Sequence, residues 1–236
     1  MKILGMDSSG LVASVAVVEN DILVAEYTVN HKKTHSQTLL PMLDEIRKMT
    51  ELDFESVDAI AVAAGPGSFT GLRIGAATVK ALGFALDKPV VSVPTCHGLA
   101  YNMWGTDKVV CPILDARRNQ VYTGVYEFID GNLQVIMDQD AMGIDELVHY
   151  LNQMGRQVIF VGDGIPVYSE YIQDNLSCGY QFAPAGFNRQ RASSVAALGL
   201  KLFEEGKYEN ADDMKPIYLR KSQAEREREE QLKKEG

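Results

Sequence analysis

Three closely spaced glycines, Gly65, Gly67 and Gly71, form the segment of this sequence that is best suited to chemistry. An apolar run at Val57–Val62 precedes them, and an alanine- and glycine-rich run at Leu72–Leu86 follows. The pattern predicts a strand, a turn and a helix, whose backbone amides can meet an anion such as phosphate. A P-loop would need Gly-Lys-Ser/Thr at the last glycine, and a dinucleotide fingerprint would need that glycine one residue earlier. The unit is therefore a strand–turn–helix that is neither a P-loop nor a dinucleotide-binding fingerprint.

Similar elements surround this unit on both sides. Before it, alternation and helical spacing predict strands at Lys2–Asp7, Ala13–Val18 and Ile22–Val29 and a helix at Ser36–Met49. After Lys108 the pattern restarts, with strands at Val109–Leu114, Gln120–Phe128, Leu133–Met137 and Gln157–Val161, and helices at Ile144–Met154 and Ser194–Glu205. Asp115 follows the first strand of this second copy, as Asp7 ends that of the first. The sequence therefore predicts two α/β lobes, Met1–Asp107 and Lys108–Arg220, around a cleft, and a charged, flexible tail at Lys221–Gly236.

Composition limits the possible partners. The chain has 236 residues, of which 46% are hydrophobic and 23% charged, as is usual for a globular protein. A net charge of −9 argues against electrostatic binding of nucleic acid over a large surface, so any contact with RNA is expected to be indirect or minor. No apolar run approaches the length of a membrane span, the start lacks a signal peptide, and the three cysteines form no C-x-x-C pair. We therefore expect a cytoplasmic protein without a membrane partner.

The duplicated unit resembles the ribonuclease-H-like half of the actin, Hsp70 and sugar-kinase superfamily. In that superfamily each lobe places a phosphate-facing turn after its first strand. The resemblance implies a nucleotide cleft lined by Asp7, Ser8, Ser9, Gly65 and Gly67. In the second lobe, Arg117 and Arg118 could attract an anion, but no glycine at Asp115–Asn119 lets the backbone close on it. We therefore predict a degenerate cleft and no bound cofactor.

Four segments carry a more specific resemblance: DSSGLVASVAVVEND, HSQTLLPMLDEI, GPGSFTGLRIGAATVKAL and PIYLR. Together they resemble the bacterial TsaB family, also called YeaZ and once described as glycoprotease-like. The likeness runs from Lys2 to Arg220. It implies a subunit of the machinery that places threonylcarbamoyl on the tRNA adenosine next to the anticodon. It also implies a catalytic paralogue, TsaD, and a small ATPase as partners. For the chain alone we expect a homodimer.

The resemblance also implies that this chain lacks catalytic residues. The paralogue carries His-x-x-x-His after its corresponding helix, which places both rings on one helical face to bind the catalytic metal. Thr95 and Leu99 occupy those positions here, beside Cys96 and His97. We therefore expect neither a metal site nor catalytic residues. The pair His31 and His35 has the same spacing, but the lysines between them would repel a cation.

Two of the predicted helices are more apolar than packing on one sheet requires. Leu72–Leu86 carries only Arg73 and Lys80 as charges, and Leu39–Met49 is similarly apolar. Such helices are typically buried on more than one side, so we expect them to bind a second copy or the paralogue. The expected contact residues are Leu39, Met42, Leu43, Ile46, Leu72, Gly75, Ala76, Val79 and Gly83.

These observations favour a non-catalytic subunit that scaffolds or activates its catalytic paralogue. The alternative is an independent ATP-binding enzyme of the superfamily, acting through Ser8, Ser9 and the turn at Gly65–Gly67. A metal-dependent hydrolase is a third possibility, although no serine lies in the G-x-S-x-G pattern of a nucleophile elbow.

Overall fold

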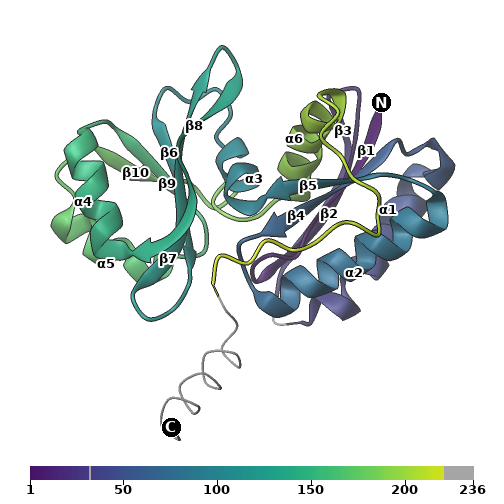
Figure 1. Ribbon diagram of the computed structural model, residues 1–236, viewed down its shortest axis with the longest axis horizontal. Coiled ribbons are helices and arrows are strands. Elements are labelled where there is room, and N and C mark those ends of the chain that lie inside the picture. Colours follow the sequence, from purple (N-terminus) through teal and green to yellow (C-terminus); the bar gives the residue numbers. More distant parts are fainter. Residues whose placement is uncertain (32, 221–236) are drawn as a thin grey trace, which may run out of the picture.

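Two five-stranded mixed sheets, each covered by helices, form the computed structural model of this protein (Figure 1). The structure describes residues 1–31 and 33–220. The tail predicted at Lys221–Gly236 lies outside the described residues, so the prediction of its flexibility stays untested.

The first sheet has the strand order β3-β2-β1-β4-β5. β1, β2 and β3 form an antiparallel meander, and β4 and β5 run parallel to β1. Every residue of β4 is buried, because helices cover both faces of the sheet, and this is why its sequence is a continuous apolar run. The strands are β1 (Lys2–Asp7), β2 (Val12–Glu19), β3 (Ile22–Asn30), β4 (Ala59–Gly65) and β5 (Val90–Pro94).

The second sheet repeats this topology in the order β10-β9-β6-β7-β8. β6, β7 and β8 are the antiparallel meander, and β9 and β10 run parallel to β6. The internal duplication predicted from the sequence is therefore confirmed. The strands are β6 (Val109–Asp115), β7 (Gln120–Ile129), β8 (Asn132–Gly143), β9 (Val158–Val161) and β10 (Tyr180–Phe182).

Two helices cover the outer face of each sheet (Figure 1). On the first sheet these are α1 (Leu39–Thr50) and α2 (Phe69–Leu86), with short 3₁₀ turns at His35–Gln37 and Phe54–Ser56. On the second they are α4 (Ile144–Met154) and α5 (Ile165–Asn175). By length and hydropathy alone, α2 is apolar enough to cross a membrane. Its inner side, however, packs into the core of the first lobe, where Ala76 and Val79 meet residues of β1 and β4.

The remaining two helices are exchanged between the lobes. α6 (Ala192–Glu204) lies late in the chain, yet its Val195, Ala196 and Leu200 pack on Ile3 and Ala61 of the first sheet. Conversely, α3 (Thr95–Tyr101) lies in the first half, and its Cys96, Leu99 and Ala100 pack on β6 and β7 of the second sheet. The two inner faces of the sheets are therefore closed by helices from the opposite half of the chain.

The predicted boundary at Asp107/Lys108 consequently needs correction. It falls just before β6, but α6 and the segment that follows it return to the first lobe. This returning segment, which we call the strap (residues 205–220), pairs Glu209 with Val90 and donates from the Ile217 amide to the Ala64 carbonyl at 2.7 Å. The first lobe therefore comprises both ends of the described chain, because the apolar face of α6 fits the first sheet.

Candidate functional site

The five residues predicted to line a nucleotide cleft do lie together. Asp7, Ser8 and Ser9 form the loop after β1, and Gly65 and Gly67 form the turn after β4, the parallel neighbour of β1. The Ser68 amide donates to the Ser9 carbonyl at 2.7 Å, and the Ser8 hydroxyl donates to the Gly71 carbonyl at 2.9 Å. The two loops are therefore bonded directly to one another.

Glycine is required in this turn because the protein's own backbone approaches it. A Cβ atom at Gly67 would overlap the Ser9 carbonyl oxygen, and one at Gly71 would overlap that of Ser8. Gly65 has a φ of +125°, and the Ile217 carbonyl of the strap lies against it. These contacts explain the glycine spacing without a phosphate, since the groups that approach most closely belong to this chain.

Several amides of the turn are already bonded inside the protein. The Gly65 amide donates to Thr95 Oγ1 at 3.1 Å, and the Gly71 amide donates to Ser68 Oγ at 3.2 Å, which caps α2. A helix N-terminus binds an anion through unpaired amides. Because these amides already have partners, the geometry suits a structural turn better than a phosphate cradle.

Asp7 is the most perturbed carboxyl group of the cleft. Its side chain is 2% exposed, and its Oδ1 accepts hydrogen bonds from the amide and hydroxyl of Ser9 at 2.8 and 2.7 Å. Burial raises its pKa to about 6, and the nearby carboxylate of Asp163, from the second lobe, adds to this rise. The pKa of Asp163 is itself raised by burial. Asp7 and Asp163 thus bring two carboxyl groups toward one another across the lobe boundary.

The corresponding turn of the second lobe is more open. Arg117, Arg118 and Asn119 all have left-handed backbone conformations, with φ of 62°, 57° and 57°, and all three are exposed. Asp115 closes the turn, since its Oδ1 accepts from the Arg117 amide at 2.8 Å and from the Tyr168 hydroxyl at 3.1 Å. From the strap, Arg220 donates to the Ala116 carbonyl at 2.8 Å.

Thr95 and Leu99, the two positions at which the resemblance implies histidines in a paralogue, have other roles in this chain. Thr95 accepts the Gly65 hydrogen bond, and Leu99 is buried in the core against the second sheet. Between them, His97 lies 3.6 Å from Asp138, and burial lowers the pKa of its imidazole. In the described part of the chain, no group of three or more His, Cys, Asp or Glu side chains is arranged to hold a metal.

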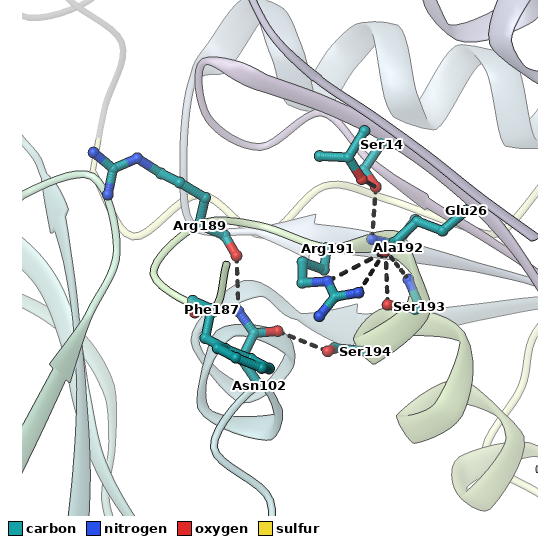
Figure 2. A network of polar contacts seen from close by, with 10 residues as sticks. Ser14, Glu26, Asn102, Phe187, Arg189, Arg191, Ala192, Ser193 and Ser194 are labelled. Carbon is teal, nitrogen blue, oxygen red and sulfur yellow. Dashed lines mark hydrogen bonds and ion pairs between the residues drawn. The ribbon is translucent and has the colours of Figure 1, made fainter. Parts of the chain in front are cut away.

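A polar network fixes the loop that carries the chain back into the first lobe (Figure 2). Glu26 of β3 accepts two hydrogen bonds from Arg191, at 2.6 and 3.2 Å, and two more from the amide and hydroxyl of Ser193. Asn102 donates to the carbonyls of Phe187 and Arg189 and accepts from the Ser194 hydroxyl. These bonds fix the start of α6 to β3 and to the end of α3.

The nine residues predicted for a partner interface are placed differently from the prediction. All nine are buried within the first lobe, on the sides of α1 and α2 that face the sheet. The prediction is therefore wrong as to these residues. Apolar residues at helical spacing mark the side of a helix that packs in the core, and here that core belongs to the chain itself.

The outer sides of the same helices carry a second set of apolar side chains that the prediction missed. Phe84 is 79% exposed, Met49 77% and Leu40 53%. Along α2 the exposed apolar positions recur at helical spacing, and we call them the outer strip: Ala77, Ala81, Phe84 and Ala85. The available sequence signal was Phe84 itself, a large aromatic residue that lies off the inward-facing stripe of α2.

Two tandem ribonuclease-H-like lobes, with a turn after the first strand of each, place the protein in the actin-like and sugar-kinase-like class. A polyphosphate/ATP-glucomannokinase from Arthrobacter shares this fold, with a TM-score of 0.52 at 12% identity over 86% of this chain and 99% of that one. A family model described as TsaD, tRNA N6-adenosine threonylcarbamoyltransferase, matches residues 23–228. The chain belongs to the TsaB family of tRNA threonylcarbamoyladenosine biosynthesis proteins.

The relatives match over nearly their whole length. The TsaB protein of Bacillus subtilis is 35% identical over 226 residues, which cover 95% of this chain and 96% of that protein. The TsaB protein of Escherichia coli is 27% identical over 231 residues, with the same coverage. The structure of YeaZ from Pseudomonas aeruginosa has a TM-score of 0.77 at 25% identity and covers 92% of this chain and 99% of that one. The family resemblance predicted from the sequence is confirmed.

Proposed function

We propose that this protein is a non-catalytic subunit in the threonylcarbamoylation of tRNA adenosine, and that it binds its catalytic paralogue, TsaD, through the outer strip of α2. The observation that carries the proposal is the 79% exposure of Phe84 on a long, nearly uncharged helix. Covering a phenylalanine side chain is worth about 1.5–3 kcal/mol. A surface of this kind favours a partner over water.

The residues around Phe84 suit the approach of another helix. Ala77, Ala81 and Ala85 are small, so a partner backbone can come close to α2 between them. Met49 at the end of α1 adds a flexible apolar side chain that adapts to a partner's shape. A second copy of the chain would use the same surface when the paralogue is absent, which gives a homodimer.

The cleft and α3 support a non-catalytic role. The loop residues Asp7, Ser8 and Ser9 are buried and bonded within the chain, and Leu99 offers no ligand atom where the paralogue has a histidine. We infer that the protein acts by binding one conformation of the paralogue more tightly than another, which shifts the paralogue's conformational populations. The small ATPase of the pathway would join this assembly, and a cytoplasmic location follows from the tRNA substrate.

Solution mass of the chain alone, and mixed with the paralogue from the same genome, tests this proposal. The wild-type chain is expected to form a homodimer that converts to a heterodimer. Phe84→Glu is expected to weaken both associations at least tenfold, since a loss of about 1.4 kcal/mol already suffices for this factor. The melting temperature of the variant should match the wild type, because the side chain is exposed.

Val167→Glu is the matched control, since Val167 is also exposed, at 57%, but lies on α5 of the second lobe. It should leave both associations unchanged. If the mixture gives no heterodimer, or if Phe84→Glu assembles as tightly as the control, the proposal is wrong. Saturable ATP binding with phosphoryl transfer by the isolated chain would instead favour the alternative, an independent enzyme of the sugar-kinase class.

A further inference from the structure

Four arginines lie along the boundary between the two lobes: Arg73, Arg117, Arg118 and Arg220. Arg73 of α2 donates to the Tyr218 hydroxyl at 3.3 Å, and Tyr218 precedes Arg220 in the strap. Arg220 in turn donates to the Ala116 carbonyl at 2.8 Å, next to Arg117 and Arg118. The strap thus links the start of α2 to the left-handed turn of the second lobe. We call these four residues the arginine row.

The charges of the arginine row are not neutralised within the described part of the chain. Arg47, Arg156 and Arg191 each pair with a carboxylate, whereas none of the four residues of the row does so in residues 1–31 and 33–220. Asp115 is the acidic residue nearest to Arg117 in sequence, and within the described residues it bonds to the Arg117 amide and the Tyr168 hydroxyl rather than to a guanidinium group. Within residues 1–31 and 33–220, a chain of net charge −9 therefore gathers positive charge at one place without carboxylate partners.

An aromatic surface lies beside this charge. The ring of Tyr218 stacks on that of Phe69, with centroids 4.6 Å apart and an angle of 6° between the planes, and Tyr218 is 40% exposed. Guanidinium groups bind phosphate through paired hydrogen bonds, and aromatic rings stack on unpaired bases. An acidic protein segment would use the charges but not the stacked rings, so the combination favours RNA.

We propose that the arginine row binds backbone phosphates of tRNA, with Arg117 and Arg118 as its main contacts. This inference rests on the proposed function, because that function supplies the RNA. It modifies the expectation, drawn from the net charge, that any contact with RNA is indirect or minor. The net negative charge argues against RNA binding over a large surface, whereas contact with a few phosphates requires only a local row of cations.

Replacing Arg117 and Arg118 together by alanine tests the inference. Binding of fluorescently labelled, unmodified tRNA is measured by anisotropy over a series of salt concentrations, with the full chain alone and mixed with the paralogue. The affinity at low salt should fall at least tenfold. The slope of log affinity against log salt should decrease by about 2, because about one counterion is released per phosphate contact. Both arginines are exposed, so folding should be unaffected.

Arg156→Ala combined with Lys207→Ala is the matched control, since it removes the same number of charges at exposed positions outside the row. It should keep the wild-type salt slope. Equal affinities and slopes for the two double variants would overturn the inference. So would a loss of ATP or inorganic phosphate binding with unchanged tRNA binding, because the row would then serve a free nucleotide. If instead the proposed function is wrong, the solution mass of the mixture with the paralogue shows no heterodimer, which is a separate measurement from tRNA binding.

Discussion

Val79→Glu is expected to unfold the first lobe, whereas Ala77→Glu, two residues earlier on the same helix, is expected to leave it folded and block assembly. Val79 has no exposed surface and packs in the core between α2 and β4, while Ala77 lies on the outer strip. Removing the valine costs about 1.5–3 kcal/mol of burial, and an unpaired carboxylate in a core costs several kcal/mol more. The sum is comparable to the whole stability of a typical domain.

Circular dichroism and thermal unfolding of the two variants separate these outcomes. The Ala77 variant should melt within a few degrees of the wild type, and the Val79 variant should show no cooperative transition. If Val79→Glu melts like the wild type, α2 does not pack inward through this residue. If Ala77→Glu unfolds, the outer strip is not a free surface.

Asp7→Asn is expected to stabilise the protein by about 2–3 kcal/mol at neutral pH. The pKa of Asp7 is raised from 3.8 to about 6 in the folded protein, mainly by burial. At about 1.4 kcal/mol per pKa unit, the ionised side chain costs the fold about 3 kcal/mol. Asparagine keeps an oxygen that can accept from Ser9, and it carries no charge.

The pH dependence of this effect has a definite sign. Below pH 3.8 Asp7 is protonated in both states, so it adds no cost. Between that pH and about 6, only the folded state keeps the proton, so wild-type stability falls as the pH rises. Urea unfolding across this interval should show the fall for the wild type, and a flatter profile for Asp7→Asn. Asp44→Asn is the contrasting control, because its pairs with Lys48 and Arg47 lower the pKa of Asp44. An unchanged profile in Asp7→Asn would contradict the assignment.

The sequence predicted most of the strands because their residues alternate or are wholly apolar. β1 was placed at its observed bounds, and β2, β3, β6 and β7 within one or two residues. α3, α5 and β10 were not among the predicted elements. β10 has only three residues, and α5 buries only Tyr168 and Ile172, so neither has a strong periodic signal. Gly164 and Pro166 at the start of α5 were the available cues.

The placement of elements relative to one another was harder to predict than their existence. The apolar side of α6 indicates that the helix is buried, but not that Gly199 fits against Ala61 of the first sheet. The same ambiguity affected α2, where Val79 was predicted to meet a partner and instead meets the core of its own lobe. The superfamily resemblance did imply that Asp7 and Gly67 lie together. The strap and the Ser8–Ser9 backbone fill the space around the turn. This packing depends on the three-dimensional structure and could not be predicted from spacing.

The exchange of α3 and α6 has a consequence for synthesis on the ribosome. Domains generally fold as units, with the N-terminal one first. Here Ile3, Ala61 and Val91 pack with Val195, Ala196 and Leu200 of α6, which lies near the end of the described chain. A nascent chain that has just emerged through β5 therefore exposes one apolar face of a finished sheet until α6 arrives. The first sheet is therefore closed only after the strands of the second lobe have been synthesised, and a chain cut between the halves would leave each sheet without the helix that covers its inner face.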